Sequence, residues 1–236
     1  MTRTFFNEGV NLNYMEIALL GGTGDIGEGL ALRWARDTDH TIIIGSREPE
    51  KATSKADAYQ TQLTERGVEQ DIEGYGNEEA AANAEVVVVS VPPQYASDTV
   101  EAVTPALEDG DVLVSPAVQM TRDADGFHYD PPEAGTVAEA IAAAAPTGVP
   151  VVGAFQNLAA GALSDLDTEL TADVVVTGDD GDAKDVVQSL AEDIAGIRAL
   201  DGGPLANTGV VESITPLLIN LAMNNEGLHD LTVRFQ

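Results

Sequence analysis

Three glycines near the start of the chain have the spacing of a loop that binds phosphate groups. Gly22, Gly24 and Gly27 form a Gly-x-Gly-x-x-Gly pattern that directly follows the apolar run Glu16–Leu20 and precedes a predicted helix over residues 28–36. In this context the first glycine permits a tight turn, the second lets the backbone approach a pyrophosphate, and the third lets helix and strand pack closely. Free N–H groups at the helix N-terminus then face the anion. The sequence therefore predicts a dinucleotide-binding loop at residues 22–27.

The end of the next apolar run indicates which dinucleotide binds. An NAD-binding protein carries an acidic residue there, which holds the ribose 2′-hydroxyl. Here residues 41–44 are followed by Gly45, Ser46 and Arg47, with Lys51 one helical turn further on. A hydroxyl, a guanidinium and an ammonium group converge where a 2′-phosphate would lie, so the pattern predicts NADP(H). Lys55 is close in sequence but is equally well explained as a solvated helix residue.

The elements that must position these residues alternate regularly. Short apolar runs predict strands at Glu16–Leu20 and at residues 41–44, 86–91, 112–115 and 150–154, and helices are predicted at residues 28–36, 50–66, 95–107 and 135–145. Continuous apolar runs are typical of parallel strands covered on both faces. We therefore expect an α/β fold: a Rossmann-type, doubly wound parallel sheet.

The pattern changes after residue 154. Strands are expected at residues 174–177, 197–200 and 231–235, and helices at residues 182–193 and 207–225, while residues 119–133 read as an irregular loop over the cleft. We expect an N-terminal extension over residues 1–14, an NADP-binding Rossmann domain over residues 15–154, and a smaller C-terminal α/β domain over residues 155–236 that completes the cleft.

The third apolar run ends at Val91-Pro92-Pro93, and a proline pair there turns the chain over the ligand cleft. Val91 and Tyr95 are candidates to flank the nicotinamide half of the cofactor. Tyr95 is equally well explained as a core residue at the start of a helix.

The composition narrows the classes of partner. There are 40 acidic and 11 basic residues, a formal net charge of −29 and no cysteine. Such a charge argues against nucleic acids and anionic membranes as partners, and the lack of cysteine excludes disulfides and thiolate chemistry. Acidic residues spread along the whole chain predict a halophilic, cytoplasmic protein, although an acidic protein of a low-salt organism has the same composition. No apolar run reaches the ~18 residues of a membrane span.

Several segments together resemble one family, the archaeal NADPH-dependent coenzyme F420 reductases. They are MEIALLGGTG from Met15, the Gly45-Ser46-Arg47 stretch with Lys51, VSP from Val114, GGPL from Gly202 and VESITPLLIN from Val211. The resemblance implies direct hydride exchange between NADP(H) and the deazaflavin coenzyme F420, and a homodimer. It implies cofactor contacts by Thr23, Gly24, Asp25, Ile26, Ser46, Arg47 and Lys51, and by alignment also by Val91, Tyr95, Val118, Ala160 and Leu231. Since hydride transfer needs placement more than acid–base chemistry, no catalytic side chain and no metal site are predicted.

The chain departs from the family pattern near the expected deazaflavin site. Residues 156–159 read Gln-Asn-Leu-Ala where the family often has a His-Thr-Ile-Pro-like stretch, and Ala162 replaces an arginine. Arg122 and Arg198 remain as candidate partners for the anionic tail of the coenzyme. Two alternatives therefore stay open: an NADP-dependent reductase of another small acceptor (an imine, ketone, flavin or chelated metal) and a non-catalytic NADP(H) sensor.

Overall fold

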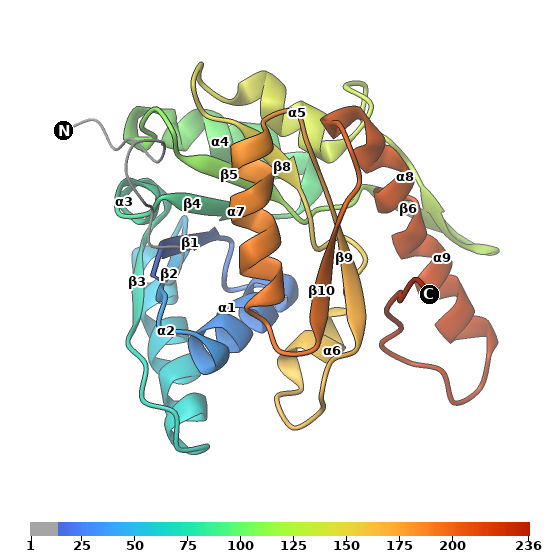
Figure 1. Ribbon diagram of the computed structural model, residues 1–236, viewed down its shortest axis with the longest axis horizontal. Coiled ribbons are helices and arrows are strands. Elements are labelled where there is room, and N and C mark those ends of the chain that lie inside the picture. Colours follow the sequence, from blue (N-terminus) through green and yellow to red (C-terminus); the bar gives the residue numbers. More distant parts are fainter. Residues whose placement is uncertain (1–13) are drawn as a thin grey trace.

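A continuous eight-stranded sheet runs through the computed structural model, which describes residues 14–236 (Figure 1). The strand order is β10-β9-β8-β5-β4-β1-β2-β3. The bounds are β1 Glu16–Leu20, β2 Thr41–Ser46, β3 Ile72–Gly76, β4 Val86–Val89, β5 Val112–Ser115, β8 Val151–Gly153, β9 Ala172–Gly178 and β10 Ile197–Asp201. Six neighbouring strands of this sheet, β3, β2, β1, β4, β5 and β8, are parallel. Strand β9 is antiparallel to β8, and β10 is parallel to β9. The predicted Rossmann-type α/β fold is therefore confirmed.

Helices cover both faces of this sheet. Helices α1, α2 and α7 lie on one face and α3, α4 and α5 on the other. The helices of residues 14–236 are α1 Asp25–Asp37, α2 Pro49–Thr64, α3 Asn77–Ala82, α4 Ala96–Val103, α5 Val137–Ala144, α6 Ala160–Ser164, α7 Gly181–Glu192, α8 Thr208–Glu212 and α9 Ile214–Asn224. Polar side chains start two of them: Thr136 accepts a hydrogen bond from the Glu139 N–H at α5, and Asp180 accepts one from the Ala183 N–H at α7. Within residues 14–236, none of the helices combines the length and apolar character that crossing a bilayer requires.

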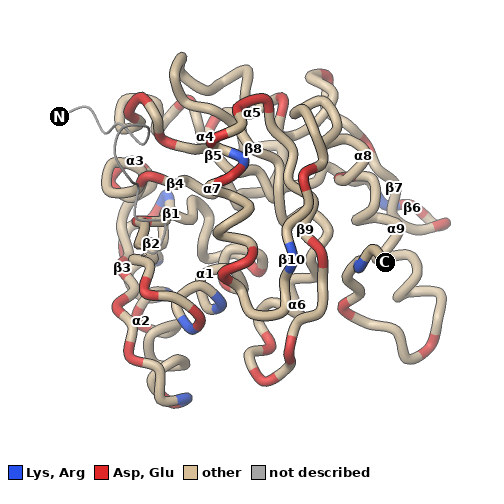
Figure 2. Tube along the Cα trace, viewed as in Figure 1, with Lys and Arg blue, Asp and Glu red and all other residues tan. Residues whose placement is uncertain are grey.

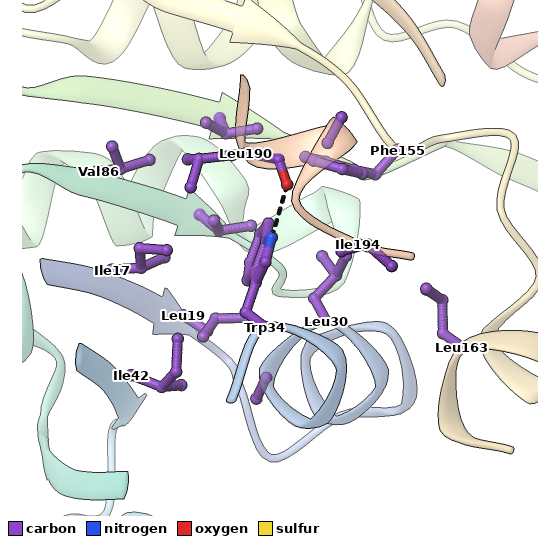
Figure 3. Close-up of a cluster of buried hydrophobic side chains, with 14 of the residues drawn as sticks. Ile17, Leu19, Leu30, Trp34, Ile42, Val86, Phe155, Leu163, Leu190 and Ile194 are labelled. Carbon is purple, nitrogen blue, oxygen red and sulfur yellow. Dashed lines mark hydrogen bonds between the residues drawn. The ribbon is translucent and has the colours of Figure 1, made fainter. Parts of the chain in front are cut away.

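Alternate side chains of each central strand are buried on opposite faces. Ile17 and Leu19 belong to the core beneath α1, α2 and α7, whereas Ala18 and Leu20 belong to the core beneath α3, α4 and α5. Figure 3 shows the first of these cores, where the Trp34 indole N–H of α1 donates to the Leu190 carbonyl of α7 at 2.8 Å. Burial on both faces explains why these strands have continuous apolar sequences.

Three expectations for the second half were wrong. Residues 207–225 do not form one helix, because the chain breaks at Ser213 between α8 and α9; Pro216 has no N–H to continue the ladder back to residue 212. Residues 119–133 are not irregular, since they contain the hairpin of β6 Met120–Asp123 and β7 Gly126–Tyr129. Residues 231–235 form no strand, since their backbone link to β9 is one bond from the Asp173 N–H to the Val233 carbonyl.

The short elements β3, α3 and α6 were not predicted, because none contains a periodic apolar run. Strands β9 and β10, from the segment expected to be a second domain, extend the same sheet as β1 to β8. A single sheet thus spans both predicted domains, and the predicted domain boundary at residue 154 stays a prediction. The expected N-terminal extension lies outside the described residues, except for Tyr14.

Candidate functional site

The glycine loop joins the end of β1 to the start of α1, as predicted. The tight turn begins at Gly21, which has a positive φ of 78°, and the Gly24 N–H donates to its carbonyl at 2.9 Å. A Cβ on Gly27 would lie 2.6 Å from the Gly22 Cα, so the helix meets the loop at a distance that only glycine allows. Gly24 precedes the first helical residue, and the free N–H groups of the first turn of α1 are directed at the loop. This cradle fits a pyrophosphate.

Ser46, Arg47 and Lys51 lie together at the carboxyl end of β2 and the start of α2. Ser46 is 8% exposed, and its hydroxyl accepts a hydrogen bond from the Glu48 N–H. Among residues 14–236, neither Arg47 nor Lys51 forms an ion pair with a carboxylate. Lys55 differs, since its ammonium lies 3.3 Å from the Glu28 carboxylate. Two cations and a hydroxyl are thus available to a phosphate at this point.

Elsewhere the surface is mainly acidic. Figure 2 shows many aspartates and glutamates distributed along the chain, and lysines and arginines at only a few positions. A cluster of cations without carboxylate partners is therefore unusual on this surface, and long-range attraction does not explain anion binding here. An anion bound at this cluster must be held by direct contacts with these side chains.

A cavity of about 340 Å³ opens beside the glycine loop, at the carboxyl ends of β1, β4 and β5. Asp25, Ile26, Val91 and Val118 are among the residues that line it. Ligands of open α/β sheets bind at this edge. Tyr95 does not line this cavity: its ring lies beneath the Arg47 guanidinium, whose central carbon is 5.5 Å from the ring centroid. The structure thus separates Val91 from Tyr95, which were expected to act together at the nicotinamide.

A larger cavity of about 700 Å³ adjoins the first. Apolar residues of α9 form one side, and the C-terminal segment with Leu231 and the start of α6 with Ala160 form the other. Both cavities are lined by Asp25, Ile26, Met120, Gln156, Leu158 and Thr215. These residues form a wall common to both cavities, so two flat ligands, one in each cavity, would both contact this wall and approach each other beside it.

Gln156 stands at that wall and is held rigidly. It follows Phe155, a non-glycine residue with a φ of 71°, whose ring packs edge-on against Trp34 with the ring centroids 5.6 Å apart (Figure 3). The Gln156 side-chain N–H donates to the Ser115 backbone carbonyl at 2.9 Å, and the Thr215 hydroxyl donates to the backbone carbonyl of Gln156 at 2.7 Å. A strained backbone conformation costs about 1–3 kcal/mol and persists only where its surroundings enforce it, as they do here.

Two buried acceptors that line the larger cavity have no hydrogen-bond partner among residues 14–236. They are Oε1 of Gln156 and Oδ1 of Asn157, and each side chain is at most 3% exposed. An unpaired buried acceptor costs about 1–3 kcal/mol, so these atoms suit a ligand that brings N–H donors. The departure from the family pattern singled out Gln156 as a residue near the second ligand. Nothing in the sequence around it indicates the strained backbone of Phe155 or the unpaired side-chain oxygens.

The structure gives the other candidate side chains different surroundings. The Arg198 guanidinium pairs with the buried Asp173 carboxylate at 2.6 Å and donates to the Phe235 carbonyl, which ties down the C-terminal segment. Arg122 lies in the β6–β7 hairpin, with its guanidinium 5.1 Å from the Phe127 ring centroid. The larger cavity is also lined by His229, a residue that was not among the predicted site residues and that lies beside Asp230. Within residues 14–236, no group of three or more acidic, histidine or cysteine side chains is placed to hold a metal ion.

Comparison with known proteins agrees with this geometry. The family model described as "NADP oxidoreductase coenzyme F420-dependent" matches residues 16–119. A protein of Methanocaldococcus jannaschii named F420-dependent NADP reductase is 42% identical over 210 residues, which cover 88% of this chain and 92% of that protein. Its namesake from Methanothermobacter marburgensis is 41% identical over 214 residues, 89% of this chain and 94% of that one.

Solved structures give the same result. The crystal structure of an Arthrobacter protein, provisionally assigned as an F420-dependent NADP reductase, superposes with a TM-score of 0.72 at 25% identity, over 89% of this chain and 94% of that one. A Plasmodium falciparum pyrroline carboxylate reductase with NADP bound has a TM-score of 0.52 at 13% identity over 79% of this chain, which shows a shared fold alone. The chain belongs to the family of F420-dependent NADP reductases.

Proposed function

We propose that this oxidoreductase transfers a hydride directly between NADP(H) and the deazaflavin coenzyme F420. The observation that carries the proposal is the pair of adjoining cavities with a common wall at Ile26, Met120 and Gln156. Direct transfer requires the donor and acceptor carbons to be held about 3–3.5 Å apart in a site from which water is excluded. The smaller cavity takes the nicotinamide and the larger one takes the deazaflavin.

Each part of NADP(H) has a place along one edge of the sheet. The pyrophosphate binds the loop from Gly22 to Gly27 with Thr23 and Gly24, the 2′-phosphate binds Ser46, Arg47 and Lys51, and Val91 and Val118 contact the nicotinamide. On the deazaflavin side, Ala160 and Leu231 supply apolar contact. The nicotinamide and deazaflavin rings supply the redox chemistry. The protein holds the two rings in place, surrounds them with apolar side chains and offers the side-chain oxygens of Gln156 and Asn157 as acceptors for ligand N–H groups. No side chain is assigned to proton transfer.

A homodimer is part of this proposal. Val210, Leu217, Leu221 and Met223 of α8 and α9 are exposed, and Val210 is 71% exposed. Large apolar side chains grouped on neighbouring turns are typical of a surface that pairs with another chain. Because α9 also lines the larger cavity, pairing through this surface would fix one wall of the site.

We also propose that the protein works in the cytoplasm of a halophilic archaeon. A net charge of −29 with three lysines in 236 residues supports this, since such a surface repels itself unless concentrated salt screens it.

The test is the reduction of oxidised F420 in molar salt, followed as loss of its visible absorbance. We expect rapid bleaching with NADPH and much slower bleaching with NADH at the same concentration. An Arg47→Ala variant should lose most of the advantage of NADPH while keeping its melting temperature. Binding of NADPH without bleaching, with turnover of a flavin or an imine instead, would refute the assignment of the larger cavity to the deazaflavin.

A further inference from the structure

Tyr95 is an exposed aromatic residue that the redox reaction leaves unexplained. It ends the single helical turn Pro93–Tyr95 that precedes α4, and it is 45% exposed. Its backbone N–H donates to the Pro92 carbonyl at 2.9 Å, and its hydroxyl forms no hydrogen bond with any residue of the described chain. The prolines at positions 92 and 93 restrict the backbone of this turn, so the ring is presented from a stiff support.

The contact that the ring makes is with Arg47. The guanidinium carbon lies 5.5 Å from the ring centroid, which is within the range of a cation–π interaction. A guanidinium that lies over a ring is contacted on its planar face, so its N–H groups, which point outward in the plane, remain free to donate. Arg47 is thus restrained without losing the donors that bind a phosphate in a bidentate manner.

Arg47 needs this restraint because carboxylates are near it. Arg47 also lines a cavity of about 680 Å³ together with Glu78 and Glu79 of α3. A long, exposed arginine has many rotamers, and two carboxylates attract some of them away from the 2′-phosphate position. The Tyr95 ring favours the rotamers that keep the guanidinium over the ring, on the side of the cavity that Ser46 also lines.

We propose that Tyr95 is a positioning residue for the 2′-phosphate, and that it increases the preference of the site for adenosine nucleotides that carry this group. The proposal rests on the proposed function, because it requires the cluster of Ser46, Arg47 and Lys51 to bind that phosphate. It assigns Tyr95 to the adenosine half of the cofactor.

The test compares two fragments that differ by the 2′-phosphate: 2′,5′-ADP and 5′-AMP. Dissociation constants are measured by calorimetry for the full chain and for the Tyr95→Ala, Tyr95→Phe, Arg47→Ala and doubly substituted Arg47→Ala/Tyr95→Ala variants. A cation–π contact at an exposed site corresponds to a change of about two- to five-fold in affinity. We expect Tyr95→Ala to weaken 2′,5′-ADP binding by that factor and to leave 5′-AMP unchanged, while Tyr95→Phe restores most of the affinity.

In the Arg47→Ala background, Tyr95→Ala should have no further effect, because the ring then has no cation to hold. Equal weakening of both fragments would show that Tyr95 contacts the nucleotide itself and would overturn the proposal, as would an unchanged affinity in Tyr95→Ala. Failure of the proposed function has a different result: the unmodified protein would bind the two fragments equally well.

Discussion

Replacing Gly27 with alanine adds one methyl group at the most crowded point of the nucleotide loop. The new Cβ would lie 2.6 Å from the Gly22 Cα, 2.9 Å from the Ser90 hydroxyl and 3.0 Å from the Gly21 carbonyl oxygen. Two of these neighbours are backbone atoms, so the clash is relieved only by moving α1 away from the loop. Gly24 provides a matched control in the same loop. A Cβ there meets only the Gly21 carbonyl oxygen, at 3.4 Å, and its φ of −95° and ψ of 168° suit any residue.

The two substitutions should therefore separate folding from binding. Overpacking of this kind costs about 1–3 kcal/mol of unfolding free energy, which in a chain of this size lowers the melting temperature by about 2–12 °C. Gly24→Ala should change the unfolding free energy by no more than about 0.5 kcal/mol. It should nevertheless weaken NADPH binding about ten- to a hundred-fold, because the methyl group occupies the space of the pyrophosphate and its charged hydrogen bonds are lost.

The assays are thermal unfolding in molar salt and NADPH binding by fluorescence for both variants. We expect Gly27→Ala to lose stability and affinity together, and Gly24→Ala to lose affinity alone. A Gly27→Ala protein as stable as the unmodified one, or a Gly24→Ala protein with unchanged NADPH affinity, would refute the close packing or the location of the pyrophosphate, respectively.

Three further predictions concern the surroundings of the site. Asp173→Asn should cost about 1–3 kcal/mol and make the C-terminal segment more sensitive to protease, because the ion pair with Arg198 is lost and an amide keeps only one of the two oxygens that accept from Arg198 and the Phe235 N–H. The hydrogen bond from the Arg198 guanidinium holds the pKa of Asp173 below its usual value. The unmodified protein should therefore lose the stability that this pair contributes as the pH falls through the lowered pKa, and the variant should show no such loss. Identical acid-unfolding curves for the two proteins would contradict this. Burial raises the pKa of Glu212 to about 7, so stability should fall as the pH rises from the usual glutamate value to about 7, and Glu212→Gln should flatten this part of a melting-temperature profile. Lowering the salt from molar to millimolar should lower the melting temperature steeply, whereas a flat profile would contradict adaptation to high salt.

Much of the fold of residues 15–154 could be predicted because it depends on local patterns. The glycine loop, the polar tip after residue 44 and the buried strands each have short sequence signals with direct physical causes. Ser46 and Arg47 indicated a phosphate site because the hydroxyl and the guanidinium that would bind it come from adjacent residues.

The larger cavity was not predictable in the same way, because distant segments form it. Its walls come from the end of β8, from α9 and from residues 228–231, which meet only through the tertiary fold. The strained Phe155 has no sequence signal, and its conformation is fixed by packing against Trp34 of α1. Tyr95 was placed near the nicotinamide from its position after a strand, whereas its ring lies against Arg47, a residue that is distant in sequence.

The most direct test of the central claim follows the transferred hydrogen itself. NADPH carrying deuterium at both C4 positions is mixed with the protein and oxidised F420 in molar salt, and the reduced coenzyme is examined by mass spectrometry. Because the two cavities adjoin at Gln156 and Ile26, direct transfer predicts one deuterium in each molecule of reduced F420. Reduced F420 that contains only hydrogen from the solvent would contradict the account.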